Sequence, residues 1–139
     1  FNPEVFAMAR PLDRGKIKQF RRGLEQLDQE GVVQVLRDLD FGDTEPVLAA
    51  VGVLQFEVFA HRLQSEFGAP AEIVSAPYQA MRITDRASAD RLRAIGGIRI
   101  LYRGDEMVAL FENKYRLQRL EQDEPELTLQ PVFSGQPDT

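Results

Sequence analysis

The hydrophobic residues of the chain alternate between two spacings, and the order of these spacings limits the fold more than any other feature. Residues 5–10 form a short apolar run followed by proline, which is typical of a β-strand. The spacing then changes to steps of three and four, at Ile17, Phe20, Leu24 and Leu27. With Asp13 as a candidate N-cap and Gly31 where a helix would stop, the sequence predicts an amphipathic helix over residues 14–30.

The segments that follow complete a unit of six elements. Residues 32–39 and 46–51 predict two strands joined by the turn-forming residues 40–44. Gly52 begins a second predicted helix, which ends at Gly68 and carries an apolar stripe of Phe56, Phe59, Leu63 and Phe67. A fourth strand is predicted over residues 71–76. This order is that of the ferredoxin-like split βαβ fold, in which two helices cover one face of an antiparallel sheet.

The second half of the chain repeats this order more weakly. Its predicted elements are a strand, a short helix, a hairpin of two strands, a helix capped by Asn113 and a last strand, over residues 79–83, 88–95, 98–102, 106–111, 113–124 and 127–133. We therefore predict an α+β protein with two consecutive ferredoxin-like βαββαβ units, residues 1–76 and a smaller unit over residues 77–133. Residues 134–139 have no apolar anchor and are predicted to form a disordered tail.

The sequence offers no arrangement that is typical of a catalytic or metal site. It has no cysteine and one histidine, His61, so a thiolate metal site or a catalytic triad lacks its partners. Gly96 and Gly97 are not followed by Lys-Ser or Lys-Thr, so we expect no GTP binding by this chain. We interpret the carboxylates Asp38 and Asp40 as parts of a solvated turn. The sequence therefore predicts no enzyme activity and no cofactor in this chain.

Composition limits the setting in which the chain acts. No apolar run approaches the roughly 20 residues that span a bilayer, and no secretion signal opens the sequence. Together with the absence of cysteine, this favours a cytoplasmic protein that does not enter membranes. The chain begins with Phe1 instead of methionine, from which we expect a piece of a longer protein.

Charge is segregated along the chain although the net charge is only −5. Residues 10–22 hold six bases and one acid, whereas residues 25–45 hold seven acids and one base. Cations near a helix N-terminus oppose the helix dipole, so a basic first half is unfavourable for the predicted helix. Either this is an ordinary solvated face, or phosphate or an acidic protein surface binds there. The candidate binding residues are Arg14, Lys16, Lys18, Arg21 and Arg22.

Two segments resemble a known family. Residues 16–35, KIKQFRRGLEQLDQEGVVQV, are similar to the first helix and second strand of the last domain of the class II peptide chain release factors, the release factor 3 family. Residues 50–58, AVGVLQFEV, resemble the strand-to-helix junction of the same domain, and residues 62–67 continue the likeness. We expect Gly52 to allow a tight corner there, and Leu54 and Phe56 to begin the buried face of the helix.

The resemblance implies work on the ribosome during translation termination. Proteins of this family are translational GTPases that eject class I release factors after peptide release. Their GTP and magnesium are bound by an N-terminal domain. The last domain is implied to contact small-subunit RNA and protein near the decoding region, with no DNA or membrane partner, and the five cations are our candidates for the ribosome contact.

Two alternatives remain open at this point. The strand-to-helix junction also resembles the third domain of elongation factor G and of ribosomal protection proteins, although Gln55, Phe56 and the helix end at Glu30 favour the release factor. A ferredoxin-like domain that binds a small regulatory ligand is the alternative from a different class.

Overall fold

The computed structural model describes residues 3–42 and 45–132 and contains two four-stranded antiparallel sheets. The first sheet has the order β2-β3-β1-β4, and the second has the order β6-β7-β5-β8. In both, the third strand of the unit lies between the first and the second, as the split βαβ fold requires. The predicted α+β class with two ferredoxin-like units is therefore confirmed.

The first unit follows the predicted element order. Its elements are β1 (Val5–Pro11), the 3-10 turn η1 (Arg14–Lys16), α1 (Ile17–Gln29), β2 (Gln34–Leu36), β3 (Val47–Ala50), α2 (Leu54–Phe67) and β4 (Ala71–Ser75). The second unit also has all six elements, namely β5 (Ala80–Ile83), α3 (Arg86–Ile95), β6 (Ile98–Arg103), β7 (Glu106–Phe111), α4 (Lys114–Asp123) and β8 (Gln130–Pro131).

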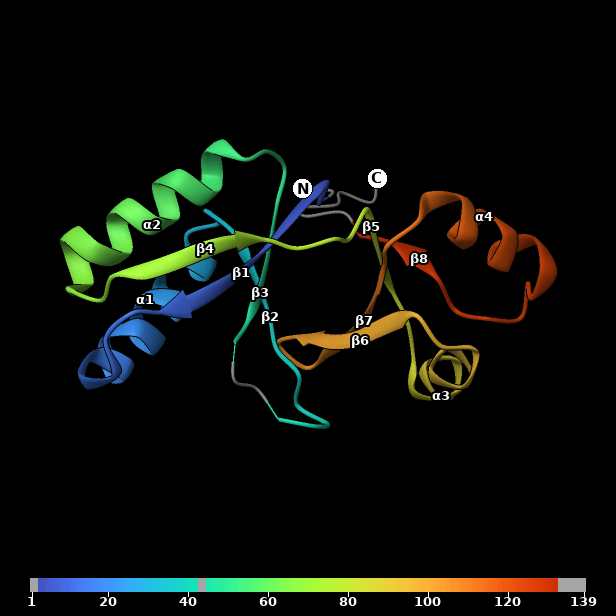
Figure 1. Ribbon diagram of the computed structural model, residues 1–139. Helices are drawn as coiled ribbons and strands as arrows, with labels where there is room; N and C mark the ends of the chain where they lie inside the picture. Colours follow the sequence, from blue (N-terminus) through green and yellow to red (C-terminus); the bar gives the residue numbers. More distant parts are fainter. Residues whose placement is uncertain (1–2, 43–44, 133–139) are drawn as a thin grey trace.

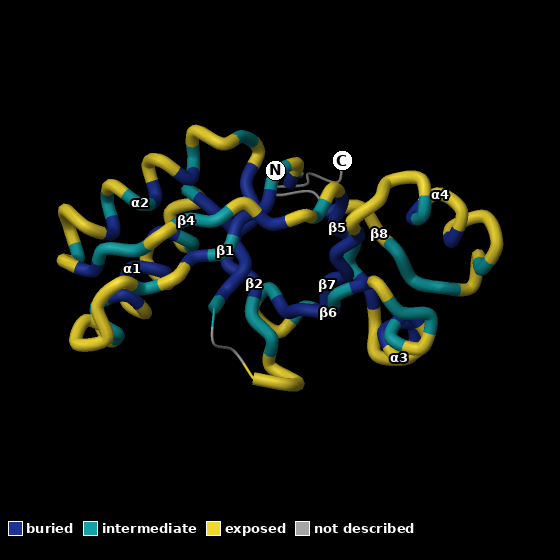
Figure 2. Tube along the Cα trace, viewed as in Figure 1, coloured by how far each residue is buried: buried dark blue, intermediate teal, exposed yellow. Residues whose placement is uncertain are grey.

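The two sheets pack against each other, with their helices on the outside (Figure 1). Along β1, Ala7 and Ala9 belong to the core under α1 and α2, whereas Phe6 belongs to a core shared by the two sheets. Along β7, Ala109 and Leu110 divide in the same way between the helix side and the shared core. Because side chains alternate across a strand, each sheet contributes one face to its own helices and the other face to the opposite unit. Strand β3 is accordingly buried along its whole length, and β7 is buried at every position after Glu106 (Figure 2).

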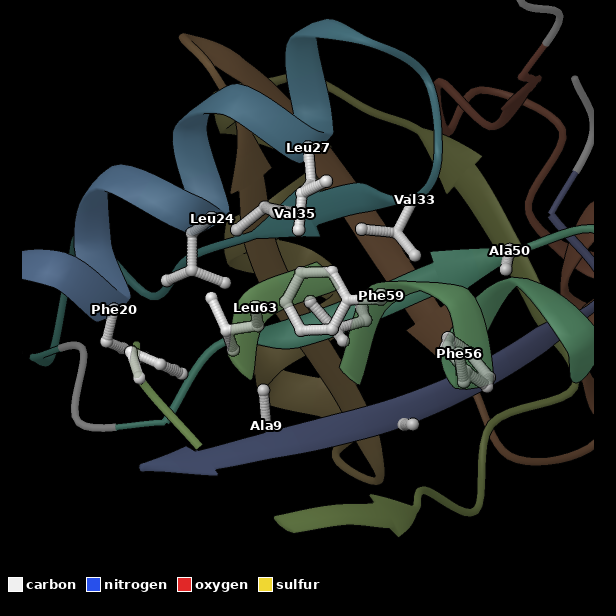
Figure 3. Close-up of a cluster of buried hydrophobic side chains, with 13 residues drawn as sticks. Ala9, Phe20, Leu24, Leu27, Val33, Val35, Ala50, Phe56, Phe59 and Leu63 are labelled. Carbon is white, nitrogen blue, oxygen red and sulfur yellow. The ribbon is translucent and has the colours of Figure 1, made fainter. Parts of the chain in front are cut away.

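The core of the first unit lies between its sheet and the pair α1 and α2 (Figure 3). Phe59 and Leu63 of α2 meet Leu24 and Leu27 of α1 there, and all four are buried. Gly23 lies where α1 faces α2, and a Cβ atom at this position would overlap the side chain of Leu63. The absence of a side chain at Gly23 therefore lets the two helices approach closely.

Several predicted boundaries are wrong at the ends of elements. β2 and β3 are shorter than predicted, and Leu39 and Val51 are exposed beyond them. The last strand is reduced to Gln130–Pro131 within the described residues. Apolar character extended these predictions past the point where the partner strand ends, because a strand needs a hydrogen-bonding neighbour as well as a suitable sequence. The predicted tail over residues 134–139 lies outside the described residues.

Candidate functional site

The five candidate cations lie on η1 and the first half of α1. Asp13 organises the start of this segment, since its carboxylate accepts a hydrogen bond of 2.9 Å from the backbone N–H of Gly15. Asp13 is thus the cap of the 3-10 turn, and α1 follows without a side-chain cap of its own. Phe20 and Leu24 hold the opposite face of α1 against the sheet. The cations Arg14, Lys16, Lys18, Arg21 and Arg22 are all exposed to solvent.

These cations are uncompensated within the described part of the chain. None of the five forms an ion pair or a side-chain hydrogen bond with another described residue. Most other arginines form such contacts. The ion pairs with nitrogen-to-oxygen distances below 3 Å are Arg10–Glu45, Arg62–Glu30, Arg62–Glu66, Arg91–Glu124, Arg93–Asp40 and Arg103–Glu106. We call the five exposed cations the basic face. Arg10, the first base of the run, is excluded from it because Glu45 and Glu72 neutralise its charge.

Glu30, at the C-terminal end of α1, has a structural role that the sequence did not reveal. Glu30 accepts a hydrogen bond of 2.5 Å from Arg62 of α2. This bond, with a second one from Gln26, lowers the pKa of Glu30 to about 2. The C-terminal end of α1 is therefore tied to α2, while its N-terminal half keeps its positive charge.

A second polar cluster joins the two units. Asp40, in the loop after β2, accepts hydrogen bonds from Arg93 at 2.6 Å and from the hydroxyl of Tyr102 at 3.0 Å. Arg86 donates to the same hydroxyl at 2.8 Å, and the hydrogen bond from Arg93 is the main cause of the lowered pKa of Asp40. We call Asp40, Arg86, Arg93 and Tyr102 the interunit cluster.

The same loop makes further contacts with the second unit. Asp38 lies 3.7 Å from Arg99, and the guanidinium of Arg93 lies 5.0 Å from the centre of the Phe41 ring. The predicted turn is present over residues 39–41, but Asp38 and Asp40 are not simply solvated, because both pair with arginines of the second unit. Sequence patterns did not reveal these contacts because their partners lie more than 50 residues away along the chain.

Backbone hydrogen bonds continue the connection between the units. Arg37 and Tyr102 exchange two of them, of 2.9 Å and 2.8 Å, in an isolated antiparallel bridge between β2 and β6. Nearby, Arg103 donates a hydrogen bond of 2.9 Å to the side chain of Gln34. The edges of the two sheets are thus joined directly, in addition to the apolar core that they share.

The three junction residues Gly52, Leu54 and Phe56 lie in different environments. Phe56 is buried as expected, but Leu54 is 64% exposed and does not begin a buried face. Helix α2 begins at Leu54 without a side-chain cap, and the side chain of Gln55 accepts a hydrogen bond of 3.1 Å from the Gly52 N–H. Gly52 has no positive φ angle, and a Cβ atom there would make only ordinary contacts, so the corner does not depend on glycine.

His61 is exposed on α2. Among residues 3–42 and 45–132, no group of three or more His, Cys, Asp or Glu side chains is placed to hold a metal ion. No helix in the same ranges is long and apolar enough to cross a membrane.

The architecture and the basic face define a class of protein: an α+β module of two back-to-back ferredoxin-like units that presents a cluster of exposed cations on η1 and the first half of α1. Comparison with known proteins gives the family. The family model described as "Class II release factor RF3, C-terminal domain" matches residues 1–121. The chain therefore belongs to the class II release factor family, as the two resembling segments indicated.

Three relatives illustrate the likeness. Proteins named "Peptide chain release factor 3" from Trichormus variabilis, a Cyanothece species and Nostoc punctiforme are 38%, 39% and 40% identical to this chain. Each alignment covers 98% of this chain and 26% of the relative. The chain thus spans about a quarter of the length of the curated relatives that it matches.

Proposed function

We propose that this chain is the ribosome-contacting C-terminal module of a translation-termination GTPase that promotes GTP-dependent dissociation of class I release factors. The observation that carries the proposal is the basic face, whose five cations have no partner among the described residues although most arginines elsewhere do. Family membership supplies the setting, because the relatives are named as release factors.

The natural ligand of such a face is the phosphate backbone of ribosomal RNA. Exposed Lys and Arg side chains neutralise phosphates and release condensed counterions, which gives affinity without requiring a base sequence. The net charge of −5 opposes this attraction at long range, so the concentration of positive charge on one helix matters. Small-subunit RNA and protein near the decoding region are the proposed partners.

In this proposal the module positions the longer protein on the ribosome and does not itself catalyse a reaction. GTP and magnesium would be bound by another domain of the longer cytoplasmic protein, and class I release factors would be affected indirectly. The shared sheet core and the interunit cluster support this role, since they hold the second unit rigidly to the unit that carries the basic face. Movement imposed at the basic face would therefore carry both units together.

Ribosome co-sedimentation over a salt series tests the proposal, with this chain and the longer protein measured side by side. The test variant is Lys18→Glu with Arg21→Glu. We expect its ribosome affinity to fall at least about tenfold, and the slope of log affinity against log salt to become shallower by about 2.

The matched control is Lys114→Glu with Arg119→Glu, which makes the same change in net charge at exposed positions on α4. We expect the control to bind nearly as the unmodified protein does. An equal loss in both variants would show that overall charge, and not the basic face, sets the affinity. Absence of ribosome binding by both the chain and the longer protein would refute the proposal.

A further inference from the structure

Phe41 has the largest exposed fraction among the large hydrophobic residues in the described part of the chain, at 79%. It lies in the loop between β2 and β3, and it belongs to none of the three apolar cores. A single exposed hydrophobic side chain is ordinary on a protein surface. Phe41 differs from an ordinary one because other residues hold its ring in place.

Two contacts fix the position of this ring. The backbone N–H of Phe41 donates a hydrogen bond of 2.9 Å to the carboxylate of Asp38. The guanidinium of Arg93 lies over the ring, 5.0 Å from its centre, and Asp40 holds that guanidinium at 2.6 Å. One face of the ring thus meets a cation, and among the described residues its other face has no aromatic or cationic partner. A ring that is already held in place loses little conformational freedom when it binds.

A depression of about 380 Å³ lies beside the ring. Its lining includes Phe41, Arg93, Arg99 and Glu112. The depression therefore combines a flat aromatic surface with side chains that donate and accept hydrogen bonds. Unpaired nucleobases are recognised by this combination, since they stack on aromatic rings and form hydrogen bonds along their edges.

The loop and the basic face lie at the same end of the first sheet. Strands β1 and β2 both pair antiparallel with β3, so they run in the same direction and end on the same side. The basic face begins after β1, and the loop follows β2. An ion pair of 2.9 Å between Arg10 and Glu45 joins the end of β1 directly to the loop. A strand of RNA bound to the basic face can therefore reach the loop that carries Phe41.

We propose that an unpaired base of an RNA strand stacks on the open face of Phe41. The inference rests on the proposed function, in which the basic face binds the phosphates of ribosomal RNA. Phosphate contacts position a strand, whereas an aromatic ring binds the bases of an unpaired strand. The basic face and Phe41 thus contact the backbone and a base of the same strand.

The charges around the ring favour a base over a basic segment of a protein. Arg93 places a positive charge over one face, so a Lys or Arg side chain on the other face would meet a like charge across the ring. A neutral base meets no such repulsion. The acids of the loop repel RNA only weakly, because Asp40 pairs with Arg93 at 2.6 Å. Asp38 likewise lies 3.7 Å from Arg99.

Ribosome co-sedimentation of the longer protein over a salt series tests the inference with Phe41→Ala. Loss of one stacked base should weaken ribosome binding about tenfold. The slope of log affinity against log salt should stay the same, because no phosphate contact is removed. Phe41→Tyr keeps the ring and should bind as the unmodified protein does. The matched control is Tyr115→Ala on α4, since Tyr115 is 76% exposed and lies outside the depression.

Fluorescence distinguishes a base from other occupants. The 139-residue chain has no tryptophan, so Phe41→Trp introduces a single reporter. At low salt, an unpaired oligoadenylate should quench this reporter by stacking, whereas an abasic strand with the same number of phosphates should not. Tyr115→Trp places the reporter at a similarly exposed position, and its fluorescence should respond to neither strand.

Three results would overturn the inference. Unchanged affinity of Phe41→Ala, with affinity still lost in Lys18→Glu with Arg21→Glu, would remove the stacking contact and leave the proposed function standing. Affinity lost in Phe41→Ala without quenching by the oligoadenylate would make the occupant a ribosomal protein. Equal quenching by the two strands would show phosphate binding near the ring without stacking. Absence of ribosome binding by the unmodified proteins would instead refute the proposed function, and this inference with it.

Discussion

Helices α1 and α3 hold the same place in the same topology, but their charges differ at both ends. The carboxylate of Asp85 caps the N-terminus of α3 by accepting a hydrogen bond of 2.8 Å from the Ser88 N–H, and Arg93 lies in the last turn, where the helix dipole favours a cation, although α3 begins with Arg86 and has no acid in its first turn. Helix α1 has no acid in its first turn and no base in its last turn. The cations of α1 lie near its N-terminus, where the helix dipole disfavours positive charge.

The partners of the cations differ as well. In α3, Arg91 pairs with Glu124 at 2.8 Å, Arg93 pairs with Asp40 at 2.6 Å, and Arg86 bonds the hydroxyl of Tyr102. These arginines fix α3 to α4 and to the first unit. The basic face of α1 makes no such contacts within the described residues. The arginines of α3 thus stabilise the second unit, whereas the cations of α1 in the first unit are free to bind another molecule.

Leu110→Ala tests whether the two units unfold as one cooperative body, and it has the largest expected effect on stability. Leu110 is fully buried in the core between the sheets. Removal of a buried leucine side chain costs about 2–5 kcal/mol of unfolding free energy. We expect a loss in this range, with both units unfolding in one transition, as measured by urea denaturation followed by far-UV circular dichroism.

The control for this change is Leu54→Ala, because Leu54 is exposed and should alter the free energy of unfolding by no more than about 0.5 kcal/mol. Two separate transitions, with only the second-unit transition shifted by Leu110→Ala, would show that the units unfold independently. The two helices would then have to be compared as parts of separate domains.

Asp40→Asn tests the paired cations of α3, and its effect should depend on pH. The pKa of Asp40 is lowered, chiefly by the hydrogen bond from Arg93, so the folded state favours the charged carboxylate. This stabilisation is fully present above the unfolded pKa of aspartate, about 4, and is lost as the pH falls through the lower folded value. We therefore expect Asp40→Asn to be less stable than the unmodified chain at pH 7, and the difference to shrink below pH 4.

Thermal denaturation at pH 7 and at pH 3 measures this change. Asp105→Asn is a suitable control, since Asp105 is exposed and its carboxylate has no ion pair with a described residue. If Asp40→Asn destabilised the chain equally at both pH values, the stability that the interunit cluster contributes would not depend on the charge of the Asp40 carboxylate.

Local patterns in the sequence predicted the order of elements because each element carries its own periodicity. Phe20, Leu24 and Leu27 define α1 within a few turns of chain, and the order of strands and helices then selects the split βαβ topology. The five cations could be identified for the same reason, since their exposure follows from the position of the apolar stripe.

Features that depend on distant residues were not predictable in this way. Val47 and Ala49 looked like an ordinary strand face, but they form the contact between the sheets, which no local period reveals. Asp40 meets Arg93 and Tyr102 only after both units have folded. Leu54 was assigned to the core because exposed and buried leucines look alike in sequence; only packing distinguishes them.

Lys18→Glu has the smallest expected effect on the free energy of unfolding, and the sign of this effect is the informative part. Lys18 lies in the first turn of α1, where a negative charge is favoured by the dipole and a positive charge is not. The reversal should therefore raise the free energy of unfolding by about 0.3–1 kcal/mol, measured by urea denaturation at low salt, while it weakens ribosome binding. Arg93→Glu in α3 should do the opposite, because it removes the partner of Asp40 and places an acid in the last turn. A loss of stability with Lys18→Glu would mean that Lys18 has a structural role, and the contrast between the two helices would then no longer separate binding cations from structural ones.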